Sequence, residues 1–367
     1  MKEMELGERL QAGIPRPVLR FLSWPFGLAV CGRNKLFDRK ILRTRSAGVP
    51  VISVGNITAG GTGKTPVAEF VARHCLKRGA KVAIISRGYK RESRGVLIVS
   101  DGRSIFVNAA GGGDEPVQIA RRLPEACVVV GERRVDAARV AVERLGAEMI
   151  VLDDGFQHRY LHRDLDIVVI DARRFDDRDL LLPAGRRREP WSGIKRADVV
   201  AFTKVNGPSE MGHAAVSRLR RWYDGPTVLF RTTLERIRRA PDDTVVIHEQ
   251  IRSTPLLAFS GIADHDGFVE DLGAVGFTVR CERRFPDHHT YSLGDVQSLI
   301  ETLSHAGAEA FMTTEKDAMR LMADEQVVER FLRTHPVYYT CIAAEVVEGE
   351  GKFLSMVNAC VDRRAHS

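Results

Sequence analysis

The chain has 367 residues, of which 44% are hydrophobic and 28% are charged, and this composition predicts a globular protein of about two domains. The net charge of +7 favours anionic partners such as a nucleotide, a phospholipid surface or a phosphorylated substrate. Aromatic residues make up only 7% and form no interleaved basic–aromatic pattern, so we expect no nucleic-acid partner. The six cysteines are scattered without a C-x-x-C pair, which predicts a reducing compartment and neither disulfides nor a zinc site.

The N-terminal segment, residues 1–45, combines an apolar run with basic flanks. Residues 17–31 are mostly apolar, but Arg20 and Pro25 interrupt them, and the run is too short to span a bilayer. It also lacks a small-residue cleavage site of the secretory type. An apolar segment with Trp24 beside a polybasic stretch is typical of an amphipathic helix on an anionic membrane. The alternative is a helix packed on the domain core, with its arginines in solvent.

A glycine-rich turn follows the predicted strand at residues 49–54 and precedes the predicted helix at residues 65–78. Such a turn directs backbone N–H groups and a helix N-terminus at a phosphate. The pattern departs from G-x-x-x-x-G-K-[ST] only in its first position, where a threonine stands. Its lysine would reach the β- and γ-phosphates, and the hydroxyl after it would bind Mg²⁺. The loop consists of Thr58, Ala59, Gly60, Gly61, Thr62, Gly63, Lys64 and Thr65.

Strands and helices alternate through residues 46–225. Short apolar strands separated by amphipathic helices predict an α/β fold with a mostly parallel sheet covered on both faces, in which ligands gather at the carboxyl ends of the strands. The predicted strands are residues 49–54, 81–86, 96–100, 126–130, 148–152, 165–171 and 198–203. The predicted helices are residues 65–78, 115–123, 133–145 and 211–223.

Two acidic sites follow elements of this sheet. Asp114 comes after a run of glycines and opens a helix, so it is either the N-cap of that helix or a proton acceptor for a substrate hydroxyl. Asp153 and Asp154 end an apolar strand, where a Mg²⁺-organising carboxylate is expected beside a phosphate loop. Successive side chains point opposite ways, so one of the pair should face the phosphates more directly. The alternative is a simple Asp-Asp-Gly turn.

The loop at residues 182–190 carries three adjacent arginines and Glu189. These arginines could bind phosphate while Glu189 assists the metal, although a solvated loop is the usual fate of such a charge run.

Residues 226–367 are predicted to form a smaller α/β unit that completes the active-site cleft. Its first strand is expected at residues 227–234, followed by a polar connection at 235–243, and its last strand at 337–339. His288 and His289 lie in a loop and could relay a proton, as could His265, or they could be solvated. Residues 313–317, Thr-Thr-Glu-Lys-Asp, could contact the nucleotide, hold the two units together or cap a helix.

Taken in order, these motifs resemble the tetraacyldisaccharide 4'-kinase family, the lipid A 4'-kinases of Gram-negative bacteria. The resemblance covers about residues 15–320. The resembling segments are residues 51–66, 86–89, 113–116, 153–158, 182–185, 188–190, 285–288 and 313–317.

The resemblance implies a P-loop NTPase-like fold and transfer of a phosphate from ATP to the 4'-hydroxyl of a tetraacylated glucosamine disaccharide 1-phosphate. It implies Mg²⁺ held near Thr65, Asp153, Asp154, Gln157 and Glu189, and a base at Asp114 paired with a histidine, with His288 favoured by its place in Phe-Pro-Asp-His. It also implies a peripheral enzyme at the cytoplasmic face of the inner membrane, with no obligate protein partner. A soluble small-molecule kinase, a nucleotide hydrolase or a membrane-associated nucleotide switch are the competing readings of the phosphate loop.

Overall fold

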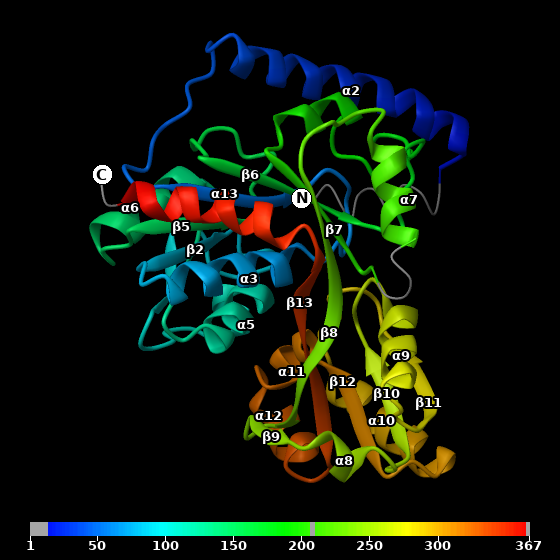
Figure 1. Ribbon diagram of the computed structural model, residues 1–367. Coiled ribbons are helices and arrows are strands. Elements are labelled where there is room, and N and C mark those ends of the chain that lie inside the picture. The colour runs from blue at the N-terminus through cyan, green and yellow to red at the C-terminus, as the bar shows by residue number, and fades with distance from the viewer. Residues whose placement is uncertain (1–13, 206–209, 365–367) are drawn as a thin grey trace.

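The computed structural model describes residues 14–205 and 210–364, and within them one 13-stranded sheet runs through a larger and a smaller unit (Figure 1). Its main path has the order β11-β10-β12-β13-β8-β7-β6-β1-β5-β2-β4-β3, and β9 pairs with β8 beside it. The smaller unit lies below the larger one in Figure 1, and the long strands β8 and β13 connect them. The predicted P-loop-like α/β fold is confirmed.

The larger unit contains six parallel strands and one antiparallel edge strand, β3. Its strands are β1 (Val51–Asn56), β2 (Val82–Ser86), β3 (Leu97–Asp101), β4 (Cys127–Val130), β5 (Met149–Asp153), β6 (Leu165–Asp171) and β7 (Val199–Thr203). Its helices are α3 (Lys64–Lys77), α4 (Ala109–Gly112), α5 (Asp114–Arg122), α6 (Arg134–Glu143) and α7 (Glu210–Leu219), with a 3₁₀ turn at Trp191–Arg196. Each predicted strand and helix of this unit is present, with its ends displaced by a few residues at most.

Alternation along the strands assigns helices to the two faces of this sheet. Ile52 and Val54 of β1 pack in one core cluster with residues of α3 and α5, whereas Val51 packs in another with residues of α6. Because successive side chains point to opposite faces, helices cover both sides and β1 is buried throughout. The phosphate loop therefore leaves the centre of the sheet.

The smaller unit is also built on parallel strands. Its strands are β10 (Leu256–Ser260), β11 (Val279–Arg284) and β12 (Ala310–Thr314), which pair in parallel, and the short β9 (Thr244–Val246) lies beside β8. Its helices are α8 (His248–Ile251), α9 (His265–Ala274), α10 (Leu293–Ala306), α11 (Glu315–Leu321) and α12 (Glu325–Val327), with a π-helical turn at Val328–Leu332. Its aromatic-rich core includes Phe259, Phe311 and Phe331.

Two expectations for the smaller unit were wrong. Residues 235–240, predicted as a polar connection, continue strand β8 (Thr227–Ala240), and β13 (Val337–Glu348) runs well beyond residue 339. The two strands pair antiparallel along nearly their whole length, so their polar side chains lie on a ladder between the units instead of in a loop.

The C-terminal helix departs from the predicted division at residue 226. Helix α13 (Glu350–Arg363) returns to the larger unit, where Phe353 and Val357 pack in the core cluster that includes α3. Residues 350–363 thus belong to the larger unit by packing, although they follow the smaller unit in sequence.

The described part of the N-terminal segment is dominated by helix α2 (Arg16–Asp38), which lies across the top of Figure 1. Leu19, Ser23 and Gly27 form its buried stripe, and the Ser23 hydroxyl donates to the carbonyl of Leu181 at 3.0 Å. Residues 1–13 of the predicted N-terminal segment lie outside the part of the chain that the structure describes. No helix in the described part of the chain is long and apolar enough to cross a bilayer.

Candidate functional site

The phosphate loop joins β1 directly to α3. Gly63 adopts a positive φ of 77° immediately before the helix begins at Lys64. Asn56 at the end of β1 donates from Nδ2 to Oγ1 of Thr62 at 3.1 Å, and Thr203 of β7 donates to the carbonyl of Thr62 at 2.6 Å. These bonds fix the turn so that the α3 N-terminus faces the carboxyl edge of the sheet, which is the arrangement that binds phosphate.

The threonine at the first position of the loop fits because another segment supports it. Thr58 pairs with Arg187 in an antiparallel bridge, and the Ala59 amide donates to the carbonyl of Arg186 at 2.7 Å. Within the loop, the positive φ values occur at Gly60 and Gly63, so the backbone at Thr58 requires no glycine. The loop at 182–190 is therefore part of the phosphate-loop framework and not a solvated charge run.

Asp153 lies at the end of β5, beside β1. Its side chain is fully buried, and neither carboxylate oxygen has a hydrogen-bond partner among the described residues. Burial and the nearby charge of Glu115 raise the pKa of Asp153 to about 7, against the opposing charge of Lys64. A buried carboxylate without a donor, next to a phosphate loop, fits the position of a Mg²⁺ ligand.

Asp154 has a different environment. Its φ is 58°, and Nη1 of Arg188 donates to both of its oxygens at 2.9 and 3.2 Å. Burial alone would raise its pKa, but the charges of Arg188 and Lys64 outweigh burial and hold the pKa below its usual range. Because Asp154 already has a cation, Asp153 is the member of the pair that fits the metal.

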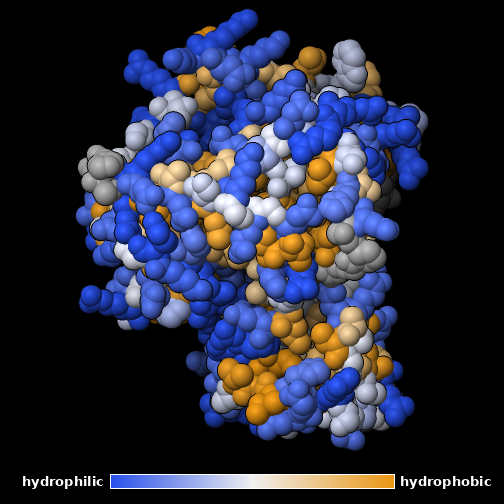
Figure 2. Space-filling view, viewed as in Figure 1, coloured by the Kyte–Doolittle hydropathy of each residue, from blue (hydrophilic) through white to orange (hydrophobic). Residues whose placement is uncertain are grey.

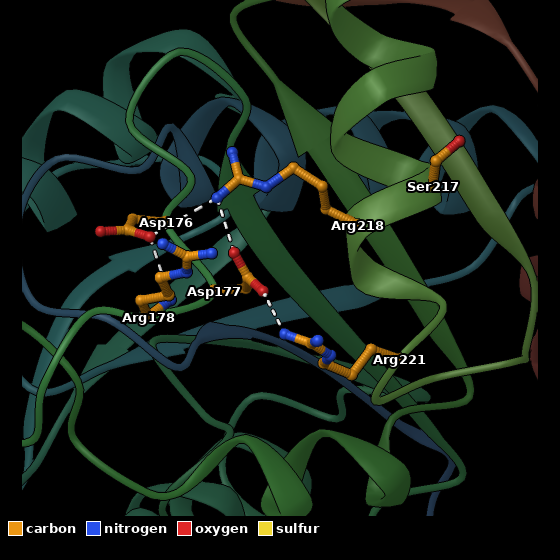
Figure 3. Close-up of a pocket in the computed structure, with 6 residues that line it drawn as sticks. All are labelled: Asp176, Asp177, Arg178, Ser217, Arg218 and Arg221. Atoms are coloured by element: carbon orange, nitrogen blue, oxygen red, sulfur yellow. Dashed lines mark hydrogen bonds and ion pairs between the residues drawn. The ribbon is translucent and has the colours of Figure 1, made fainter.

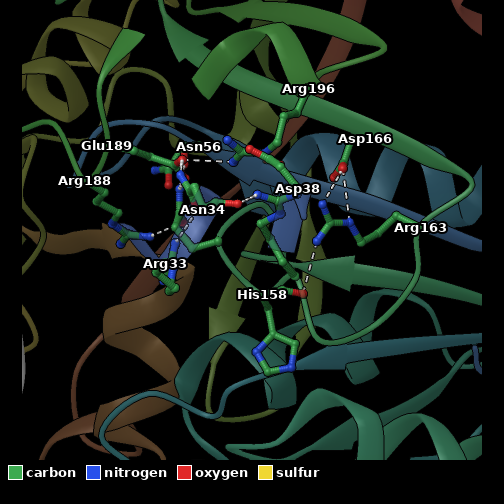
Figure 4. A network of polar contacts seen from close by, with 12 residues as sticks. Arg33, Asn34, Asp38, Asn56, His158, Arg163, Asp166, Arg188, Glu189 and Arg196 are labelled. Carbon is green, nitrogen blue, oxygen red and sulfur yellow. Dashed lines mark hydrogen bonds and ion pairs between the residues drawn. The ribbon is translucent and has the colours of Figure 1, made fainter. Parts of the chain in front are cut away.

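Glu189 is held in a polar network between α2 and the sheet (Figure 4). It is fully buried; Oε2 accepts from Asn34 at 3.0 Å and from Arg196 at 2.9 Å, and Oε1 accepts from Gln157 at 3.0 Å. Gln157 also donates to the carbonyl of Asn56 at 2.8 Å, at the start of the phosphate loop. Among the described residues, no three histidine, cysteine, aspartate or glutamate side chains are grouped to bind a metal. In this arrangement Glu189 and Gln157 support the loop, and their role at the metal stays a prediction.

Asp114 is the first residue of α5, and Gly113 is the N-cap. The N-cap position thus belongs to Gly113 and not to Asp114, which argues against the helix-cap alternative. Instead Oδ2 of Asp114 lies 3.6 Å from Nδ1 of His288, a residue of the smaller unit with a φ of 59°. Strained backbone of this kind is common where a side chain must be aimed at a site.

The two other candidate histidines face elsewhere. Nδ1 of His265 lies 2.7 Å from Oγ of Ser260 in the buried interior of the smaller unit. His289 stacks on Phe285 and contacts Asp295 at 3.1 Å. Among these three histidines, the structure therefore brings only His288 to Asp114.

Helix α11 supplies Arg320, which no motif had assigned to the site, together with Lys316 of the predicted segment at residues 313–317. Arg320 donates from Nε to Oδ2 of Asp114 at 2.6 Å, and Lys316 forms an ion pair with Glu115. Burial alone would raise the pKa of Asp114, but the hydrogen bond with His288 and the charge of Arg320 outweigh it and lower the pKa. Tyr89 from the larger unit packs edge-on against His288, with the two ring centroids 5.1 Å apart.

The Thr-Thr-Glu-Lys-Asp segment thus has two of its three predicted roles. The Thr314 side chain caps α11, and Glu315 and Lys316 join the units. Sequence order alone could not pair these side chains with α5, since they are about two hundred residues from it.

Two cavities adjoin the segment that follows β6. One of about 210 Å³ is lined by residues 58–62 of the phosphate loop together with Asp171, Arg174 and Phe175. A larger one of about 600 Å³ lies beside α7, where Arg218 and Arg221 pair with Asp177 (Figure 3). None of the predicted site residues lines the larger cavity, so the smaller one is the cavity associated with the site.

Comparison with known proteins agrees with this geometry. Residues 15–362 match the family model for tetraacyldisaccharide-1-P 4'-kinase. A tetraacyldisaccharide 4'-kinase from Anaeromyxobacter sp. (strain K) is 41% identical over 85% of this chain and 82% of its own length. A tetraacyldisaccharide 4'-kinase from Pelodictyon phaeoclathratiforme is 35% identical over 94% of this chain and 97% of its own length.

A solved structure extends the likeness to three dimensions. The crystal structure of LpxK from Aquifex aeolicus in complex with ATP superposes with a TM-score of 0.75 at 32% identity, covering 94% of this chain and 99% of that one. With the match running from α2 to α13, the chain belongs to the tetraacyldisaccharide-1-P 4'-kinase family.

Proposed function

We propose that this chain is an ATP-dependent kinase that phosphorylates the 4'-hydroxyl of a tetraacylated glucosamine disaccharide 1-phosphate in lipid A biosynthesis. The family match is the observation that carries this proposal. The site supports it because the phosphate loop leaves β1 beside Asp153, a buried carboxylate with no hydrogen-bond partner among the described residues, and because Asp114 faces His288.

Each group has a chemical task in this proposal. The α3 N-terminus, Lys64 and Thr65 bind the phosphates of ATP, and Lys64 neutralises charge as the γ-phosphate is transferred. Asp153 and Thr65 would hold Mg²⁺, which supplies further neutralisation of the phosphate oxygens. The pKa of a sugar hydroxyl lies far above neutral pH, so the hydroxyl needs a proton acceptor as the new bond forms. Asp114 is that acceptor. His288 orients Asp114.

Helix α2 suits a membrane-bound acceptor. Phe21 and Trp24 are each 76% exposed and Leu28 is 65% exposed, on the face opposite the buried stripe. Hydrophobic side chains emerge among hydrophilic ones along the top of Figure 2, over α2. We propose that this face lies in the cytoplasmic surface of the inner membrane, where an amphipathic helix binds without crossing.

The proposal is tested by incubating the full chain with γ-labelled ATP and the tetraacylated disaccharide 1-phosphate in mixed micelles. We expect label in the glycolipid. Release of labelled phosphate without labelled glycolipid would favour a hydrolase. Tight ATP binding without turnover would favour a nucleotide switch.

A further inference from the structure

Arg320 is held firmly within the smaller unit. Its side chain is only 7% exposed, and Nη1 donates to the Gly261 carbonyl at 2.9 Å and to Oδ1 of Asp317 at 2.8 Å. Asp317 is itself fully buried and accepts hydrogen bonds from the Gly261 amide and the Tyr291 hydroxyl at 3.1 and 2.9 Å. The guanidinium therefore has little freedom to move relative to α11.

The same guanidinium reaches across to the larger unit. Its Nε binds Oδ2 of Asp114 at 2.6 Å, and its Nη2 lies 3.3 Å from Nδ1 of His288. His288 faces that same Oδ2 at 3.6 Å. Since Arg320 and His288 both approach Oδ2 of Asp114, Oδ1 is the oxygen left for an acceptor hydroxyl.

A fixed donor of this kind has two opposite effects on a base. It stops rotation of the carboxylate, which helps a reaction that depends on positioning. It also makes the carboxylate a weaker base, because a nearby positive charge favours the ionised form. A loose phosphoryl-transfer transition state requires little proton transfer before the bond to phosphorus forms, so orientation outweighs the loss of basicity.

We propose that Arg320 is a positioning residue for phosphoryl transfer, which fixes the Asp114 carboxylate with Oδ1 toward the acceptor when the smaller unit docks on the larger one. The proposal rests on the proposed function of the site. Two neighbouring contacts between α5 and α11 hold this docking: the pair of Glu115 with Lys316, and the bonds of Glu315 with Arg122 at 2.7 Å and with Gln118 at 3.0 Å.

A double-mutant cycle on Asp114 and Arg320 tests the proposal. Arg320→Gln is expected to lower kcat by about 10–100-fold, with KM for ATP unchanged, because Asp114 loses its fixed orientation and this loss outweighs its gain in basicity. In an Asp114→Asn background, Arg320→Gln should lower kcat no further. A purely structural role would lower the rate equally in both backgrounds, and that result would overturn the proposal.

The pH profile provides a second readout. The titratable and charged groups facing Asp114 are Arg320 and His288, with Asp287 next to His288 and the Glu115–Lys316 pair beside them. Losing the Arg320 charge should raise the pKa of Asp114, so the acidic limb of kcat should move to higher pH in Arg320→Gln. An unmoved limb would contradict the proposal.

Arg320→Lys tests whether a folding defect explains the loss, because lysine keeps the positive charge but lacks the planar guanidinium with its several N–H donors. This variant should keep the acidic limb of the pH profile near its original position, while its kcat stays below that of the unaltered protein. Full recovery of kcat would contradict a need for the guanidinium. Arg333→Gln, which removes an exposed ion pair of the same unit, is the matched control and should behave like the unaltered protein. Failure of the unaltered protein to phosphorylate the glycolipid would instead reject the proposed function.

Discussion

Nδ2 of Asn34 donates a hydrogen bond of 3.0 Å to Oε2 of Glu189, and this contact joins the N-terminal helix to the loop beneath the phosphate loop. Glu189 is fully buried, so each of its donors matters to its stability. Helix α2 is therefore part of the framework of the site as well as the carrier of an exposed apolar face. Deleting it would remove both contributions together, so they must be tested separately.

Substitutions on the exposed face isolate the membrane contribution. The triple change Phe21→Ser, Trp24→Ser, Leu28→Ser should weaken binding to anionic vesicles, since each buried side chain of this size contributes about 1.5–3 kcal/mol. Activity on a micellar acceptor should fall much less. Vesicle co-sedimentation measures the first effect.

Val245 and Ile247 provide the control for that experiment. They are also exposed and apolar, but they lie at the far end of the smaller unit. Val245→Ser with Ile247→Ser should leave sedimentation unchanged. An equal loss of vesicle binding in the two variants would indicate nonspecific hydrophobic adsorption and not a membrane-binding face.

Asn34→Ala isolates the framework contribution of α2. It should lower kcat while leaving vesicle binding intact, because it removes a donor to Glu189 and leaves the exposed apolar side chains of α2 unchanged. Steady-state kinetics with a micellar acceptor measures this effect, and unchanged kcat would limit α2 to a membrane role.

Lys64→Ala should reduce turnover by about 100-fold or more, because one charge that acts on the transferring phosphate is lost. The charges of Lys316 and Lys64 both lower the pKa of Glu115, and Lys316 has the larger effect. Lys316 stays in place in this variant, so the fold should be retained. Near-normal kcat, measured with saturating ATP, would remove the argument based on the phosphate loop.

Asp153 and Asp154 should differ in their effect on the Mg²⁺ requirement. Asp153→Asn should raise the Mg²⁺ concentration needed for half-maximal activity much more than Asp154→Asn, because Asp154 is already bound to Arg188. Titration of activity with MgCl₂ at fixed ATP compares them. A larger shift in Asp154→Asn would reverse the assignment.

Disrupting the buried group that Arg122 forms with Glu69 and Glu315 should strongly destabilise the protein. Arg122→Ala leaves two buried carboxylates without their cation and should cost about 3–5 kcal/mol of unfolding free energy. Burial already raises the pKa of Glu69 against the charge of Arg122, so losing Arg122 raises it further.

The sign of the pH dependence of Arg122→Ala follows from that shift. A folded-state pKa above the unfolded value means that the folded form is favoured at low pH, and that this advantage is lost as pH rises through the folded pKa. The destabilisation by Arg122→Ala should therefore be larger at pH 8 than at pH 5 in urea unfolding. Arg333→Ala breaks an exposed pair and should cost only about 0–1 kcal/mol at either pH.

Sequence reasoning could predict those features whose signals are local. The phosphate loop, the alternating strands and helices, and the acids at strand ends each depend on a few adjacent residues, such as Gly63 beside Lys64. The length of β8 was missed because residues 235–240 are mostly polar, and their pairing with β13 lies about a hundred residues away.

The partners of Asp114 illustrate the same limit within the site. A histidine could be predicted from its motif, but Arg320 and Tyr89 reach Asp114 and His288 only when the smaller unit docks on the larger one. The return of α13 to the first core has the same cause, since packing against α3 leaves no local mark in residues 350–363.

The most direct test of the central claim compares two acceptors that differ by one oxygen. Tetraacylated disaccharide 1-phosphate and its 4'-deoxy analogue are each incubated with γ-labelled ATP and the full chain, and the lipid fraction is analysed. We predict label in the first acceptor and none in the second, with the label in the first lost in Lys64→Ala. Labelling of the 4'-deoxy analogue, or of neither lipid while ATP is consumed, would contradict a 4'-kinase.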